Sequence, residues 1–368
     1  MSPKKNKNQT SSQSNEATEN KAVAETEKQE VEQVTNSDLD TKKGGGAEQD
    51  SQKEQDSKVE KDSAKSEESS KSPKEALAKS KEDKDSPVVA DAEDTPINDD
   101  FSARIIVVTS GKGGVGKTTT AASISTGLAS KGHKTVVVDF DVGLRNLDLI
   151  MGCERRVVYD FINVLNGEAR LNQALIKDKH VDNLYILSAS QTKDKDSLSY
   201  AGVGKVLKEL SDMGFEYIIC DSPAGIEAGA LIALYYADAA IVTTNPEISS
   251  LRDSDRILGI LYAKSRRAVN NKESVDCKLL LTRYDVDRVT KKDMISLEDI
   301  NSLLRIPVLG VIPESKEVLK CSNDGIPVIL NQKCDAGKAY QDAVERLLGK
   351  EMPLRFTTEK TFFQKIFG

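Results

Sequence analysis

The sequence has no tryptophan, only two histidines and only five cysteines among its 368 residues. The cysteines lie far apart and form no C-x-x-C pair, which excludes the usual spacing of a zinc or iron–sulfur site. An odd number of cysteines without metal spacing indicates reduced thiols, so we expect a cytoplasmic protein. No apolar run approaches the roughly 18 residues of a membrane-spanning helix. The cysteines are Cys153, Cys220, Cys277, Cys321 and Cys334.

Residues 1–100 contain no phenylalanine, tyrosine or tryptophan. They hold 16 lysines and 25 acidic residues, against 36 basic and 34 acidic residues in 101–368, so the acidic balance belongs to this segment alone. Such a composition cannot bury enough apolar surface to offset the entropy lost on ordering. We therefore predict a disordered low-complexity tail over 1–100. Its interspersed signs and acidic residues argue against a nucleic-acid-binding arm and against a targeting peptide.

A glycine-rich stretch, SGKGGVGKTTT at 110–120, fits the pattern G-x-x-x-x-G-K-[ST]. An apolar run before it predicts a buried strand, and small and apolar residues after it predict a helix that ends near Gly132. In this context the loop N–H groups and the positive end of the helix bind phosphate. A plain glycine turn is the weaker interpretation. The predicted nucleotide-binding residues here are Gly111, Lys112, Gly113, Gly114, Val115, Gly116, Lys117, Thr118 and Thr119.

Carboxylates follow two further predicted strands, HKTVVVDFD and FEYIICDSPAG. A lone aspartate there more often just ends a strand, but these lie where open α/β sheets bind ligands. Asp141 is suited to orient or deprotonate an attacking water, and Asp139, Asp221 and Thr118 to hold Mg²⁺. The small-residue turn 222–225 favours a nucleotide switch over a simple strand end.

Lys112 is one lysine more than the phosphate-binding pattern needs. It could neutralise charge on its own nucleotide, reach a nucleotide in a facing subunit, or remain a solvated loop lysine. The pattern K-G-G-x-G-K-[ST] resembles the deviant Walker A signature of the ParA/MinD ATPases. VVVDFDVGLRNLDLIMG, CDSPAGIE and TTNPEISSLRDSDRILG narrow the resemblance to the MinD group, from about Ala103 to the C-terminus.

This resemblance implies an ATP-dependent homodimer in which Lys112 reaches the partner's nucleotide. It implies that Asp141, Lys112 and Lys117 are the catalytic residues and that Arg283 and Pro313 lie around the adenine. The stretch SSLRDSDRILGILYAKSRR predicts a helix with a charged outer face, which is usually only solvated. In the MinD group this face docks MinC-like and MinE-like regulators, which singles out Ser249, Arg252, Asp253 and Asp255.

The last residues, PLRFTTEKTFFQKIFG, carry an apolar face at helical spacing. Phe362, Phe363, Ile366 and Phe367 form that face, and Lys360 and Lys365 flank it. Docking on the domain's own surface is an alternative that periodicity leaves open. The basic flanks favour anionic inner-membrane lipids. We therefore expect a membrane-targeting segment over 351–368, after an ATPase domain over 101–350.

Together these features predict an α/β fold, a P-loop NTPase three-layer sandwich with a mostly parallel twisted sheet plus a disordered N-terminal tail. The expected function is that of a Mg²⁺-dependent ATPase, peripheral on the cytoplasmic face of the inner membrane, that recruits a MinC-like division inhibitor and is released by a MinE-like stimulator. A ParA-type DNA-partitioning ATPase is the alternative. It calls for a basic surface, whereas residues 101–368 are nearly neutral, so we expect no specific nucleic acid. An iron–sulfur carrier needs paired cysteines, and a non-enzymatic scaffold has no need of Asp141 and Asp221.

Overall fold

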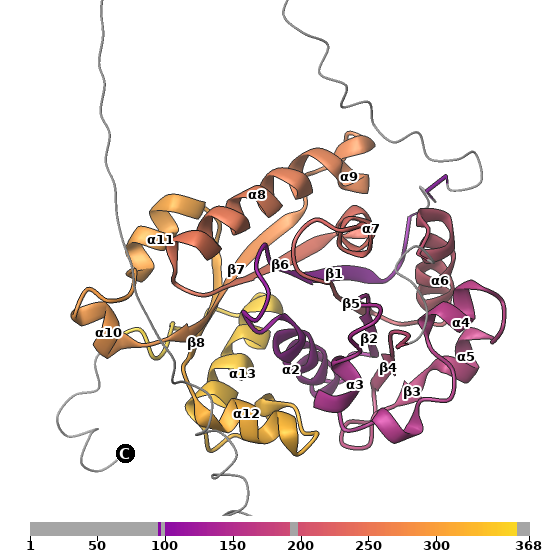
Figure 1. The fold of residues 1–368 in the computed structure, drawn as a ribbon, viewed down its shortest axis with the longest axis horizontal. Helices are drawn as coiled ribbons and strands as arrows, with labels where there is room; N and C mark the ends of the chain where they lie inside the picture. The colour runs from indigo at the N-terminus through magenta and orange to yellow at the C-terminus, as the bar shows by residue number, and fades with distance from the viewer. Residues whose placement is uncertain (1–94, 97–99, 192–197, 359–368) are drawn as a thin grey trace, which may run out of the picture. The chain divides into compact units, whose positions relative to one another are not determined.

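One eight-stranded sheet organises the part of the chain that the computed structural model describes, residues 95–96, 100–191 and 198–358 (Figure 1). The strand order is β3-β4-β2-β5-β1-β6-β7-β8, and every neighbouring pair is parallel except β3 with β4. The predicted terminal helix and residues 1–94 of the predicted tail lie outside the described residues. The strands are β1 Arg104–Thr109, β2 Thr135–Asp139, β3 Ile176–Lys177, β4 Leu184–Leu187, β5 Tyr217–Asp221, β6 Ala239–Thr244, β7 Asp276–Tyr284 and β8 Val308–Pro313.

The central strands are apolar on both faces, as parallel strands covered on each side require. In β1, Ile105 and Val107 belong to one buried cluster, and Ile106 and Val108 belong to the other. This alternation follows from the two-residue period of a strand. The sheet therefore separates two hydrophobic cores.

Helices cover both faces of the sheet, with α7 and α8 above the strands and α2 and α13 below them in Figure 1. This arrangement confirms the predicted α/β P-loop sandwich with a mostly parallel sheet. The helices on the first side are α4 Phe161–Leu165, α5 Leu171–Ala174, α6 Tyr200–Asp212, α7 Ala228–Tyr236, α8 Ile248–Lys264, α9 Arg266–Val269, α10 Val286–Thr290 and α11 Leu297–Leu304. Those on the second are α2 Lys117–Ser130, α3 Leu147–Ile150, α12 Lys316–Asn323 and α13 Asp335–Leu347, with a short 3-10 turn at Val328–Leu330.

The strand order brings the carboxyl ends of β1, β2 and β5 side by side. The glycine-rich loop leaves β1 at this edge, and Asp139 and Asp221 end β2 and β5 as register partners. Open α/β sheets bind ligands outside such carboxyl ends. The fold thus collects the predicted phosphate loop and carboxylates at one edge.

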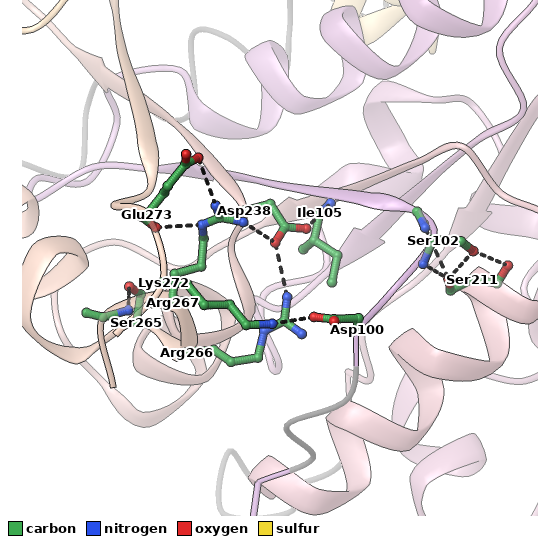
Figure 2. A network of polar contacts seen from close by, with 12 residues as sticks. Asp100, Ser102, Ile105, Ser211, Asp238, Ser265, Arg266, Arg267, Lys272 and Glu273 are labelled. Atoms are coloured by element: carbon green, nitrogen blue, oxygen red, sulfur yellow. Dashed lines mark hydrogen bonds and ion pairs between the residues drawn. The ribbon is translucent and has the colours of Figure 1, made fainter. Parts of the chain in front are cut away.

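Residues 100–103 are attached at the amino-terminal ends of β1 and β6 (Figure 2). The Phe101 ring meets the Tyr236 ring edge-on at 6.1 Å, and the Arg266 guanidinium lies 4.5 Å from the centre of the Phe101 ring. The Asp238 carboxylate accepts hydrogen bonds from the Arg266 guanidinium at 3.0 Å and from the N–H of Ile105 at 3.1 Å. Asp100 pairs with Lys272, and the N–H of Ser102 donates to Ser211 Oγ at 2.9 Å. The chain is therefore anchored before β1 begins, away from the glycine-rich loop.

All five cysteines are free, and all but the half-buried Cys334 are buried. Within the described ranges, no helix combines the length and apolar character needed to cross a membrane.

Candidate nucleotide-binding site

The glycine-rich loop turns sharply between β1 and α2. Gly114 and Gly116 have φ values of 74° and 93°, in the left-handed region that favours glycine. Gly111 is required for a different reason, because a Cβ there would lie 2.3 Å from the Cβ of Asp253 on α8. The hydroxyl of Ser110 donates to the carbonyl of Lys112 at 2.7 Å. The loop is thus shaped by its own backbone and by close packing on α8.

An open cleft of about 620 Å³ lies over this loop. Eight of the residues predicted from the sequence line it: Gly113, Gly114, Gly116, Lys117, Thr118, Thr119, Asp141 and Arg283. Gly111, Lys112, Val115 and Pro313 do not contribute to its lining. Val115 is buried, and its carbonyl accepts from the Thr282 hydroxyl at 2.7 Å. Arg283 has a φ of 53°, a left-handed conformation that is uncommon outside glycine and often found at functional sites.

Asp139 and Asp221 form a buried carboxylate pair beneath the cleft. Asp139 Oδ1 accepts from the N–H of Asp141 at 2.9 Å, and the N–H of Leu147 also donates to Asp139. Burial raises the pKa of Asp139 well above its usual range, and the nearby Asp221 carboxylate acts in the same direction. Burial also raises the pKa of Asp221 to about 7, against the opposing effects of the Thr118 hydrogen bond and the Lys117 charge. Two such carboxylates are costly without a cation.

The free oxygens of this pair fit a divalent cation. Asp139 Oδ2 and Asp221 Oδ1 are buried and have no hydrogen-bond partner among the described residues. The Thr118 side chain is hydrogen-bonded to Asp221, so the Thr118 hydroxyl is a third oxygen beside the two carboxylates. Magnesium prefers such hard oxygen ligands and keeps several of its waters.

Lys117 is only 8% exposed at the first position of α2. Burial lowers its pKa, whereas the charges of Asp221 and Asp141 oppose this effect. Its ammonium therefore depends on nearby anions, and phosphate groups in the cleft would supply more of them.

Lys112 is not part of the cleft lining, and its side chain lies at the start of α8. Its ammonium lies 2.9 Å from Glu247 Oε2 and 3.4 Å from Ser249 Oγ. The side chains of Lys112 and Glu247 are 43% and 53% exposed. The lysine that the sequence singled out is thus held on the surface of its own chain. Its role toward a second subunit stays a prediction.

The turn after β5 is tied to the glycine-rich loop. The Ser222 hydroxyl donates to the carbonyl of Val108 at 3.1 Å, and the N–H of Gly225 donates to the carbonyl of Ser110 at 3.0 Å. Gly225 has a φ of 82°, and Pro223 and Ala224 line the cleft. The turn is therefore hydrogen-bonded both to the end of β1 and to the start of the glycine-rich loop.

The segment after Asp141 and the end of α12 form two further walls of the cleft that the sequence did not single out. The first of these walls directly follows Asp139-Phe140-Asp141 in the sequence, so its position in the chain could have indicated it. Nothing local in the sequence marks the second wall. The walls touch through Gly152 and Gly325, since a Cβ on Gly152 would lie 2.5 Å from the carbonyl oxygen of Gly325. Both glycines have positive φ, 60° and 63°. The additional lining residues are Leu144, Asn146, Leu149, Ile150, Glu227, Ser322 and Asn323.

The predicted regulator-binding residues lie along the first turns of α8. Arg252 and Asp255 are exposed, Asp253 is half-buried against Gly111, and Ser249 lies beside Lys112. The apolar positions of the same helix, Leu251, Ile257, Leu258 and Leu261, are buried as the spacing predicts. This face therefore adjoins the glycine-rich loop.

Known proteins share both the sequence and the fold. The family model for the CobQ/CobB/MinD/ParA nucleotide binding domain matches residues 106–328. The septum site-determining protein MinD of Escherichia coli K12 is 68% identical over 268 residues, which is 72% of this chain and 99% of that protein. This chain belongs to the MinD family. MinD proteins are nucleotide-binding cell-division ATPases that determine the septum site.

Solved MinD structures have the same fold. One chain of the MinC:MinD complex of Aquifex aeolicus is 40% identical to this protein. The match covers 70% of this chain and 100% of that chain, with a TM-score of 0.61. MinD of Pyrococcus horikoshii, complexed with Mg-ADP, is 30% identical, covers 67% of this chain and 96% of its own, and gives a TM-score of 0.59. The match to the Escherichia coli MinD leaves 100 of the 368 residues without a counterpart, as many as the polar segment 1–100 contains.

Proposed function

We propose that this protein is a Mg²⁺-dependent ATPase that helps to place the division septum through an ATP-dependent homodimer. The observation that carries the proposal is the buried pair Asp139 and Asp221 directly beneath a phosphate-binding loop. A nucleotide-free structural protein has no use for two buried carboxylates with unpaired oxygens. A MinD that binds Mg-ADP has been solved, which supports ATP and Mg²⁺ as the ligands here.

In this proposal each residue has a separate task. The loop N–H groups and Lys117 bind the phosphates, and Asp141, which lines the cleft, orients or deprotonates the attacking water. Thr118, Asp139 and Asp221 hold Mg²⁺ directly or through water. When bound, Mg²⁺ neutralises charge that develops on the phosphate oxygens. Lys112 leaves Glu247 and contacts the nucleotide of the second subunit, as an arginine finger does.

The proposal extends to the membrane and to two regulators. The apolar face of Phe362, Phe363, Ile366 and Phe367, flanked by Lys360 and Lys365, inserts reversibly into anionic lipid on the cytoplasmic side of the inner membrane. One short helix binds weakly, and two held in a dimer bind much more tightly because the second insertion is intramolecular. A MinC:MinD complex exists, which supports a MinC-like partner. We assign this partner to the charged face of α8. A MinE-like stimulator would release the dimer.

Liposome pelleting with ATP against ADP tests this function, with DNA binding measured in parallel. We expect ATP-dependent pelleting on anionic vesicles and no ATP-dependent DNA binding. DNA binding without pelleting would instead indicate a ParA-type partitioning ATPase. In the double variant Phe363→Glu/Ile366→Glu, pelleting should be lost at unchanged melting temperature. A large fall in melting temperature would mean that the segment packs on the domain.

A further inference from the structure

The chain after α13 is held against that helix by hydrogen bonds from one arginine. We define residues 350–358 as the strap. Arg346 of α13 donates to the carbonyls of Met352 at 3.0 Å and Pro353 at 2.6 Å, both in the strap. It also donates to the carbonyl of Leu309 in β8 at 2.6 Å. One guanidinium thus joins the strap to the helix and to the edge of the sheet.

A second arginine fastens the strap further along. Arg355 forms a bidentate ion pair with Asp342 of α13. Its Nε lies 2.6 Å from Asp342 Oδ2, and its Nη2 lies 2.7 Å from Asp342 Oδ1. Its Nη2 also donates to the carbonyl of Lys338 at 3.3 Å. Asp342 is only 4% exposed, so its carboxylate depends on this partner. Parallel arginine–carboxylate bonds fix geometry as well as contact.

The residue after Arg355 is held in an unusual conformation. Phe356 has a φ of 65°, which is rare for a bulky residue and persists where surrounding contacts impose it. Its side chain packs against the core cluster that contains α13, and the Arg355 guanidinium lies 5.6 Å from its ring centre. Leu354 packs against the other cluster. The strap is therefore fixed by side chains on both sides of Arg355.

We infer that the strap fixes the position at which residues 359–368 begin, and that Asp342 and Arg346 are positioning residues for membrane attachment. The inference rests on the proposed function, because it concerns the same terminal segment. With the strap closed, Phe362 lies about four positions after its last residue, and with the Arg355 pair broken it lies about nine positions after Pro353, which Arg346 still holds. Effective concentration falls as roughly the −3/2 power of tether length, so breaking the pair should weaken the second insertion about threefold.

Two variants release the strap beyond Pro353 without removing positive charge. Asp342→Asn deprives Arg355 of its carboxylate, and Arg355→Lys keeps the charge but cannot form the bidentate pair. Arg155→Lys is the matched control, because the Arg155 side chain is 94% exposed and lies outside the strap. The first measurement is the initial rate of tryptic cleavage after residue 355, followed by mass spectrometry without lipid. We expect about tenfold faster cleavage in Asp342→Asn, in line with the loss of a charge-assisted pair, and no change in the control.

The second measurement is ATP-dependent pelleting on anionic vesicles, with ATP turnover in the absence of lipid as the internal control. We expect both variants to need about threefold more lipid for half-binding at unchanged turnover. The direction of the change in lipid affinity is decisive. If Arg355 served only as a cation for lipid, Asp342→Asn would free it and lipid binding would tighten. Tighter or unchanged pelleting, or unchanged cleavage beside normal pelleting, overturns the inference alone. A wild-type protein that never pellets overturns the proposed membrane function, and the positioning role with it.

Discussion

The ammonium of Lys112 lies 2.9 Å from the carboxylate of Glu247 in the same chain. The hydrogen bond from Lys112 lowers the pKa of Glu247, so this carboxylate is charged at neutral pH. Both side chains are largely exposed, and such pairs contribute only about 0–1 kcal/mol. Lys112 can therefore leave Glu247 at little cost when phosphates of a second subunit come within reach.

Lys112→Ala should abolish ATP-driven dimerisation while a single subunit still binds ATP. The reason is that Lys112 does not line the cleft of its own subunit, whereas Lys117 does. Lys117→Ala should lose nucleotide binding itself. A fluorescent ATP analogue measures binding, and light scattering measures the dimer. Dimer formation by Lys112→Ala at wild-type ATP concentrations would contradict a role across the interface.

Asp141→Ala should bind Mg-ATP, form the dimer and hydrolyse ATP slowly. Asp141 lines the cleft but is not one of the two buried carboxylates at the ends of β2 and β5. Loss of a positioned base typically costs about 10²–10⁴ in rate. Single-turnover hydrolysis checks the rate, and light scattering checks the dimer. Normal turnover would move the catalytic role to another carboxylate, Asp139 first.

Asp221→Asn should stabilise the nucleotide-free protein and remove its response to Mg-ATP. Burial raises the pKa of Asp221 to about 7, which means that its charged form is disfavoured in the fold. Each kcal/mol gained should raise the melting temperature by about 2–4 °C in a domain of this size. Melting curves with and without Mg-ATP test this, with the exposed Asp255→Asn as control. A lower melting temperature without nucleotide would contradict the expected strain.

Removal of residues 1–94 should leave the melting temperature, ATP turnover and lipid binding nearly unchanged.

Phe101→Ala should lower the melting temperature by several degrees, because Phe101 contacts both the Tyr236 ring and the Arg266 guanidinium. Partial burial and the cation–π contact together contribute about 1–2 kcal/mol. Phe101→Leu, which keeps much of the apolar contact, should lie between. Equal melting temperatures for the wild type, Phe101→Ala and Phe101→Leu would show that the Phe101 contacts add nothing to stability.

Local signals carried much of the sequence prediction. The glycine loop, its flanking strand and helix, and the aspartates that end β2 and β5 are each marked by neighbours in the chain, so the fold class followed from them. The contacts between distant segments left no such mark. Lys112 and Glu247 are 135 positions apart, and Ser322 and Asn323 reach the cleft only because α12 packs beside α3. Arg355 lies just upstream of the predicted membrane face and pairs with Asp342, a contact that helical spacing could not indicate because it carries no information on tertiary partners.

The backbone contact between Gly152 and Gly325 has a consequence for the two cleft walls. The two glycines meet so closely that neither position has room for even a methyl group. One follows the cleft wall that carries Asn146 and Leu149, and the other follows the wall that carries Ser322 and Asn323. The two walls therefore share one backbone contact, and a methyl group at either glycine would push them apart.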